Sequence, residues 1–372
     1  MSSDLDAAID AAAEAASRLV ETGVLTGAVV AAANGSGDLA QRAVGLSAGG
    51  APIAPDDLFL TTSITKAVTA IQVMRLVDDG LLDLRARVQD HLPGFSGDGK
   101  DAVQVWHLLS HTSGLSQRAN VIEGPLTSLE ADELESYAIA TPLSRPPGEV
   151  EYCSPGFWLL AAIIREITGE HHVEHLRTRI TGPVGISADQ LDYAPGNAPP
   201  ARLVPAIASR NAHLAEQVRR NAYPAGGIVA TGVGLARLGA ELIRSARTGS
   251  GLLSPAAVTT LSRPWSRGVW PDGRPAVWGL GMELKPPGEL CGTPTLFHSG
   301  ASGVGWWVDL ERGVSLALLS ADWYIPRTVH ANVSDAFSAE LSRARVTAAA
   351  TFTRADATPP DMPIDPSDWR TS

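Results

Sequence analysis

The sequence predicts an α+β fold in which an antiparallel sheet carries helices from both ends of the chain and a mostly helical lobe is inserted between its strands. Two observations lead to this class. Each end of the chain combines short strand-like runs with a segment of helical apolar spacing, at residues 4–20 and 328–345. The middle of the chain, in contrast, has mainly helical spacing. We therefore expect the first and last strands to pair in one sheet.

The length of 372 residues predicts one large domain built of two interlocked lobes. We assign residues 1–345 to this domain, with a sheet lobe at residues 1–60 plus 276–345 and a helical lobe at residues 61–275. Residues 346–372 are rich in proline and aspartate and are expected to form a C-terminal tail.

Composition excludes several classes of protein. The net charge of -11 argues against nucleic-acid binding, which requires a basic face. Cys153 and Cys291 are too few for a disulfide framework and indicate a reducing compartment, although a single bridge between them stays open. The N-terminal segment lacks the features of a secretion signal, and no apolar run approaches the roughly 18 residues of a membrane span. We expect a soluble, cytoplasmic protein with no membrane partner.

The strands are predicted from short apolar runs that end at turn residues. Residues 27–33 and 39–45 flank a turn cluster and predict a hairpin, whose glycines open no helix and so indicate no phosphate loop. Four later runs are expected to be neighbouring antiparallel strands, at residues 277–284, 295–299, 303–310 and 314–320. The helices at residues 4–20 and 328–345 should pack on this sheet.

Residues 61–80, TTSITKAVTAIQVMRLVDDG, predict a buried helix because apolar residues occupy more than one of its faces. Ser63 and Lys66 stand three residues apart, so the ammonium can reach the hydroxyl. Burial would lower the pKa of Lys66 and let its amine accept the proton of Ser63. An arginine could not do this, and the chain has only three lysines, Lys66, Lys100 and Lys285, against a large excess of arginine.

Other polar segments have weaker functional signals. Residues 110–115, SHTSGL, are expected to form a hydrogen-bonded bend beneath the site, and Tyr152 lies on a loop. His171 and His175 have the spacing of a helical metal pair, but no third ligand is evident, so we predict no metal. Five tryptophans lie downstream, and most should pack in the core while some line a cleft: Trp265, Trp270, Trp278, Trp306 and Trp307. The adjacent Trp306 and Trp307 should face opposite sides of a strand.

Several motifs together carry a family resemblance. They are SITK at 63–66, LLSHTSGL at 108–115, YCS at 152–154, PAGGI at 224–228 and HSG at 298–300. In order and spacing the sequence resembles the serine β-lactamase and penicillin-binding-protein superfamily over residues 5–345. It is most similar to the class C-like branch, which includes family VIII carboxylesterases and related acyltransferases. The resemblance implies a β-lactamase/DD-peptidase-like fold and no cofactor.

The resemblance also implies roles for individual residues. Ser63 would be the nucleophile, Lys66 its proton partner and Tyr152 a second acid/base, while the formal base, Lys66 or Tyr152, stays open. The backbone amides of Ser63 and Ala301 would form the oxyanion hole. The residues expected to contact the substrate are Ser154, His298, Ser299 and Gly300.

Two departures from the family pattern bear on the substrate. His298 stands where a lysine is usual, and Ser154 stands where asparagine is typical, which favours uncharged esters over carboxylate-bearing substrates. We predict a serine esterase acting on a small-molecule ester through an acyl-enzyme. The alternatives are acyl transfer to an alcohol or amine and, less favoured, a β-lactamase, a D-alanyl-D-alanine carboxypeptidase, a non-catalytic sensor or a metal-dependent hydrolase. The oligomeric state is not predicted.

Overall fold

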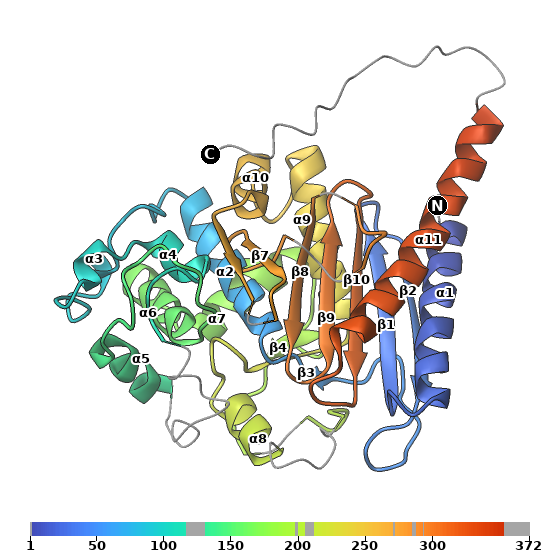
Figure 1. Ribbon diagram of the computed structural model, residues 1–372, viewed down its shortest axis with the longest axis horizontal. Coiled ribbons are helices and arrows are strands. Elements are labelled where there is room, and N and C mark those ends of the chain that lie inside the picture. The colour runs from blue at the N-terminus through green and yellow to red at the C-terminus, as the bar shows by residue number, and fades with distance from the viewer. Residues whose placement is uncertain are drawn as a thin grey trace.

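A five-stranded antiparallel sheet in the order β2-β1-β10-β9-β8 joins the two ends of the chain (Figure 1). The computed structural model describes residues 2–116, 131–197, 200–204, 212–270, 272–284, 288–292 and 294–352. The strands of the sheet are β1 (Gly27–Asn34), β2 (Leu39–Gly45), β8 (Thr295–Gly300), β9 (Val304–Asp309) and β10 (Val314–Ser320). Because β1 pairs with β10 along its length, the predicted pairing of first and last segments is confirmed.

One face of the sheet is covered by the terminal helices α1 (Ser2–Glu21) and α11 (Arg327–Phe352), which also pack against each other (Figure 1). Their apolar sides form a core cluster with the sheet that includes Ile9, Trp307 and Phe337. Helix α11 continues to Phe352, so its predicted end at residue 345 was wrong. The added residues, VTAAATF, contain an alanine run of high helix propensity.

The opposite face of the sheet is covered by α9 (Gly232–Thr248), which packs on β1, β9 and β10. Small residues allow this close approach, since a Cβ at Gly239 would collide with Ser315. The rest of the inserted lobe is mainly helical and lies beside the sheet (Figure 1). Its helices are α2 (Ile64–Asp78), α3 (Val88–His91), α4 (Val105–Leu109), α5 (Ala131–Ala140), α6 (Pro155–Thr168), α7 (His172–Leu176), α8 (Ala212–Arg220) and α10 (Pro255–Ser262).

Two small sheets supplement this architecture. Strands β3 (Phe59–Leu60), β5 (Ile228–Ala230) and β4 (Leu191–Tyr193) form one, and β6 (Ser266–Val269) pairs with β7 (Pro275–Trp278) in the other. The predicted strand at residues 277–284 was therefore wrong in extent. The chain leaves β7 at Trp278 and turns at Gly281, whose φ is +75°. Only Glu283 then bridges to Phe297 of β8.

Helix α2 lies at the centre of the larger core cluster. Every residue from Ile64 to Met74 is buried, as its apolar pattern predicted. Trp306 belongs to this cluster and Trp307 to the one beneath α1 and α11, which confirms that they face opposite sides of β9. No disulfide joins Cys153 to Cys291. Among the helices that the structure describes, none has the length and hydrophobicity needed to cross a membrane.

Candidate active site

Ser63 and Lys66 meet at the beginning of α2. Ser63 is the N-cap of the helix and Lys66 lies in its first turn, so the Lys66 Nζ is 3.1 Å from the Ser63 Oγ. The lysine side chain is 1% exposed, and burial lowers its pKa from 10.5 to about 7. A substantial fraction of Lys66 is therefore a neutral amine at neutral pH, poised beside a hydroxyl group.

The turn at residues 224–228 fixes the position of this amine. Lys66 Nζ donates a second hydrogen bond, of 3.1 Å, to the carbonyl oxygen of Ala225. One helical turn further on, the Thr69 hydroxyl donates to the carbonyl oxygen of Pro224 at 2.7 Å. The PAGGI motif thus docks on one face of α2 and holds the lysine amine against Ser63.

Tyr152 approaches the same pair from the loop that precedes α6. Tyr152 and Ser63 line the same cavity, and Lys66 Nζ lies 5.0 Å from the centroid of the Tyr152 ring. Burial raises the pKa of the Tyr152 phenol, and the Ser63 side chain acts in the opposite direction. The phenol is therefore protonated at neutral pH, which suits it to donate a proton, whereas the neutral amine of Lys66 is suited to accept one.

His111 contacts both Tyr152 and the loop that carries it. Its carbonyl oxygen accepts from the Glu151 N–H at 2.8 Å and its Nδ1 accepts from the Cys153 N–H at 3.4 Å, so it holds both neighbours of Tyr152. The two rings also pack, with centroids 4.5 Å apart. His111 has a φ of +59°, an unusual conformation for a residue other than glycine. The predicted bend beneath the site is confirmed, and it braces the loop that carries Tyr152.

A pair of hydroxyl groups joins the two segments expected to form the oxyanion hole. Thr62 Oγ1 lies 3.0 Å from Ser302 Oγ and accepts from the Ser302 N–H at 3.2 Å. This contact links the residue before Ser63 to the residue after Ala301. A Cβ at Gly300 would collide with the Thr62 side chain, so glycine permits the approach. The sequence offered only a weak signal for Thr62 and Ser302, as hydroxyl residues adjacent to motifs.

Most of the predicted site residues line one cavity of about 330 Å³. Those on its wall are Ser63, Tyr152, His298, Ser299, Gly300 and Ala301. Lys66 lies beneath Ser63, and Ser154 does not line the cavity because it is buried at the N-cap of α6. Two of the tryptophans singled out from the sequence, Trp270 and Trp278, contribute apolar surface. The size and mixed lining are those of a site for a small molecule.

His298 is a buried, neutral imidazole on the wall of this cavity. Its Nδ1 is 2.8 Å from the Ser299 carbonyl oxygen, which can only accept, so the proton of the neutral ring lies on Nδ1. The buried Nε2 then carries a lone pair and has no hydrogen-bond partner among the described residues. Burial lowers the pKa of His298 to about 3, with the Lys66 charge acting in the same direction. The imidazole therefore offers no positive charge to a substrate at neutral pH.

The cavity wall also contains a buried carboxylate that the sequence analysis missed. Glu283 is 3% exposed and forms ion pairs with Arg327 at 3.1 Å and Arg274 at 3.2 Å. The only sequence signal was one charged residue within the apolar run at residues 277–284. The arginines come from two other segments, so the cluster exists only in the folded chain.

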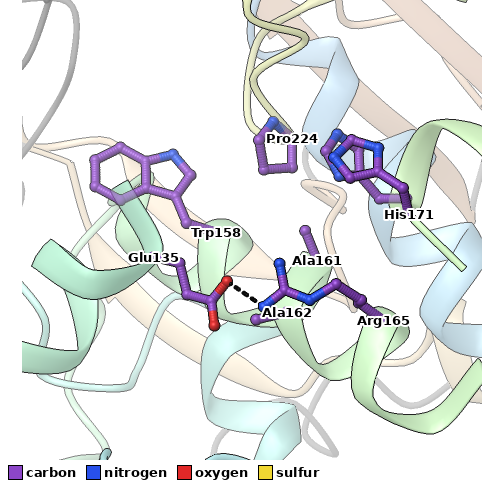
Figure 2. Close-up of a pocket in the computed structure, with 8 residues that line it drawn as sticks. Glu135, Trp158, Ala161, Ala162, Arg165, His171 and Pro224 are labelled. Atoms are coloured by element: carbon purple, nitrogen blue, oxygen red, sulfur yellow. Dashed lines mark hydrogen bonds and ion pairs between the residues drawn. The ribbon is translucent and has the colours of Figure 1, made fainter. Parts of the chain in front are cut away.

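A second, much smaller cavity of about 20 Å³ lies at α6 (Figure 2), and Ser63 does not line it. Figure 2 shows the Arg165 guanidinium directed at the Glu135 carboxylate, and their closest atoms are 2.7 Å apart. His171 and Trp158 complete its wall. The volume is about that of one water molecule, so this cavity has no room for an organic substrate.

The histidine pair at residues 171 and 175 has structural contacts. His171 is the N-cap of α7, and its Nδ1 accepts from the Val173 N–H at 3.4 Å. His175 is buried, with its Nδ1 3.0 Å from the Gln72 Oε1 on α2. Within the described part of the chain, no three His, Cys, Asp or Glu side chains are grouped closely enough to hold a metal ion. The two histidines therefore have separate structural contacts, His171 at the start of α7 and His175 with α2.

Comparison with known proteins places this site in a family. Residues 12–339 match the beta-lactamase family profile. Esterase EstB of Burkholderia gladioli is 30% identical over 330 residues, which cover 77% of this chain and 83% of that protein.

Solved structures agree with this assignment. A penicillin-binding-protein homologue from Caulobacter crescentus has a TM-score of 0.76 at 26% identity, with 90% of this chain and 97% of that chain covered. A family VIII carboxylesterase has a TM-score of 0.73 at 22% identity, with 90% and 97% covered. These similarities confirm the predicted β-lactamase/DD-peptidase-like fold. The chain belongs to the beta-lactamase family, and it is an enzyme of the serine hydrolase type.

Proposed function

We propose that this enzyme hydrolyses small carboxylic esters through a covalent acyl-enzyme on Ser63. The observation that carries the proposal is the buried Lys66 amine, with its pKa lowered to about 7, lying 3.1 Å from the Ser63 Oγ. The Tyr152 phenol and the shared cavity add a proton donor and a place for the substrate. Similarity to Esterase EstB supports esters as the substrate class.

Acylation follows from the positions of these groups. Ser63 Oγ attacks the ester carbonyl carbon while its proton passes to Lys66, and the backbone amides of Ser63 and Ala301 stabilise the oxyanion. When the tetrahedral intermediate collapses, the bond between the carbonyl carbon and the ester oxygen breaks. The departing alcohol takes the Tyr152 proton, and the proton held by Lys66 replaces it. The products of this half-reaction are the acyl-enzyme and a neutral alcohol.

Deacylation repeats these steps with a new nucleophile. A water molecule gives one proton to the same groups, attacks the acyl carbon and releases a carboxylic acid, and Ser63 recovers its proton. An alcohol or amine in place of water would give acyl transfer by identical steps. The cavity, with its mixed polar and apolar lining, is compatible with either nucleophile.

Hydrolysis of para-nitrophenyl esters tests the proposal. Ser63→Ala should lower kcat/KM at least about a thousandfold, because the nucleophile is lost. Ser245→Ala provides the control, since Ser245 is also a buried serine but lies on α9 outside the cavity. Undiminished turnover by Ser63→Ala would contradict the proposal.

Two additions to this assay separate the alternatives. A new ester or amide formed when an alcohol or amine is added, at the expense of free acid, would identify a transferase. A metal chelator should leave the rate unchanged, because the proposed steps use only side chains and backbone amides. Loss of activity in the chelator, restored by metal, would instead indicate a metal-dependent hydrolase.

A further inference from the structure

The Glu283 carboxylate lies between two arginines on the wall of the candidate active site. Arg327 donates from Nη1 and Nη2 to its two oxygens at 3.1 and 3.2 Å, and Arg274 donates from Nη1 at 3.2 Å. The Trp270 Nε1 approaches the same carboxylate at 3.4 Å. All four residues line the cavity that contains Ser63. This two-pronged pairing is the geometry with which arginine binds the carboxylate of a ligand.

The carboxylate is fixed in this position by the fold. The backbone of Glu283 pairs with that of Phe297 on β8, through hydrogen bonds of 2.8 and 2.9 Å. Its side chain is 4% exposed, whereas each arginine side chain is 31% exposed. The guanidinium groups are therefore the more accessible part of this cluster, whereas the Glu283 carboxylate is buried and held in place by its backbone pairing.

Protein groups already balance the positive charge of this wall. Arg274 pairs with Asp272 at 2.9 Å in addition to Glu283, so two arginines face two carboxylates. The histidines of the cavity wall add no charge near neutral pH, since burial lowers the pKa of His298 to about 3 and that of His330 to about 4. An incoming substrate carboxylate would therefore meet an arginine pair whose charge is already balanced.

We propose that Glu283 is a specificity-determining residue, an internal anion that occupies the arginine pair and restricts this enzyme to acyl groups without a negative charge. The inference rests on the proposed esterase function and narrows its substrate class. A substrate carboxylate near Glu283 would be repelled by it, and the arginine charges that could attract the substrate are already balanced by carboxylates of the protein. Removing the Glu283 charge should turn the same wall into an anion-binding surface.

Two esters of equal chain length test this inference. Para-nitrophenyl hexanoate is uncharged, and mono-para-nitrophenyl adipate carries a carboxylate where the hexanoate has its terminal methyl group. Wild-type enzyme should have a kcat/KM for the hexanoate at least about tenfold above that for the adipate. Glu283→Gln should raise the adipate-to-hexanoate ratio about 10- to 100-fold, the factor associated with one hydrogen bond between charged groups.

Asp192→Asn is the matched control. Asp192 is a buried carboxylate paired with Arg177 at 2.8 Å, and it lies on β4 outside the cavity. This substitution changes the net charge as Glu283→Gln does, so any general electrostatic effect on the anionic ester appears in both variants. The Asp192→Asn ratio should equal that of the wild type. In the double variant Glu283→Gln/Arg327→Gln, most of the increase in the adipate-to-hexanoate ratio should be lost.

Equal adipate-to-hexanoate ratios in the wild type, Glu283→Gln and Asp192→Asn would overturn the inference. A wild-type enzyme that prefers the adipate would also overturn it. Circular dichroism would reveal whether Glu283→Gln folds. If it does not, the wild-type preference for hexanoate over adipate still tests the inference. If the wild type hydrolyses neither ester, the proposed esterase function is wrong, and this result does not test the role of Glu283. Binding of free adipate, followed by tryptophan fluorescence, then still tests whether Glu283→Gln binds the anion more tightly than the wild type.

Discussion

At the scale of single residues, the site depends on a lysine whose burial changes its chemistry. The pKa of Lys66 falls to about 7 chiefly through desolvation, because it lies inside a helix whose neighbours are almost all apolar. This pKa lies below that of an unfolded lysine, so the unfolded chain binds more protons between about 7 and 10.5. The contribution of Lys66 to stability is thus fully present above about pH 10.5, decreases as pH falls, and is lost once pH reaches about 7.

The pH dependence of catalysis should follow the same group. If neutral Lys66 is the base, kcat/KM rises with pH and levels off above about 7. The neighbouring histidines cannot cause this rise of kcat/KM with pH, since the pKa of His298 is about 3 and the pKa of His111 is lowered well below its usual value. Steady-state rates on a neutral ester across this range provide the measurement. A rate that decreases as pH rises through 7 would instead make charged Lys66 the active form.

Removal of the Tyr152 hydroxyl should slow the reaction without disturbing the site. Tyr152→Phe keeps the ring that packs on His111, and it is expected to lower kcat about 100- to 10,000-fold through loss of a proton donor. KM should change much less. A kcat within a few-fold of the wild type would show that Tyr152 takes no part in proton transfer.

Individual residues were predictable where a local motif carried them. Ser63 and Lys66 are close because of helical spacing, which a sequence displays directly. The Thr62–Ser302 contact joins positions 240 residues apart, and the arginines around Glu283 come from separate segments. Such contacts depend on the tertiary fold, and no local pattern encodes them.

At the scale of elements, the bend at residues 110–115 positions the loop that carries Tyr152. His111→Ala removes both the ring contact and the acceptor for the Cys153 N–H, so it should lower kcat about 100-fold by misplacing Tyr152. His111→Asn should retain more activity, because asparagine tolerates a positive φ and can still accept a hydrogen bond.

The comparison of these two variants separates positioning from simple destabilisation. Melting temperatures show how far each variant is destabilised, and kcat measured well below both melting temperatures shows the effect on catalysis. Equal kcat values for the Ala, Asn and wild-type proteins would contradict a positioning role for His111.

Most elements followed from periodicity, and the exceptions have physical causes. Strand β2 has the predicted bounds, and the hairpin it forms with β1 is confirmed. Strand β6, with its sequence SRGV, was missed because it is short and combines an arginine with a glycine. The apolar run at residues 277–284 suggested one strand, but glycines divide it into β7 and a turn.

At the scale of the whole molecule, both ends of the chain meet in one sheet. Besides the β1–β10 pairing, the Thr26 backbone N–H and hydroxyl donate to the Asp322 carboxylate at 2.9 and 2.7 Å. The chain leaves this sheet after β2 and returns to it at β8, so the segment between these strands is connected to the sheet at both ends. The molecule should therefore unfold as one cooperative unit, with activity and structure lost together.

A substitution far from the site tests this coupling. Phe337 is 2% exposed on α11 and packs in the core beneath the sheet, so Phe337→Ala should lower the free energy of unfolding by about 3–5 kcal/mol. Asn332→Ala, at an exposed position of the same helix, should have little effect. Urea denaturation should follow one transition by circular dichroism and by activity. Loss of the circular dichroism signal at urea concentrations where the enzyme is still active would show that the molecule does not unfold as one cooperative unit.

The overall topology was predictable because strand-like runs bracket a helical middle. The packing of α9 on the inner face of the sheet was not, since its apolar pattern shows that it has a buried side but not which partner buries it. The division into a sheet lobe and a helical lobe at residues 60 and 276 remains a proposal.

Intact-protein mass spectrometry shows directly whether Ser63 carries the acyl group. Brief mixing with para-nitrophenyl hexanoate and acid quenching should give a protein heavier by one hexanoyl group, with the added mass on the peptide that contains Ser63. Ser63→Ala should show no adduct, and Lys66→Arg should form it at least about a hundredfold more slowly, because arginine cannot accept the proton. An adduct on another residue, or full ester turnover by Ser63→Ala, would contradict the account.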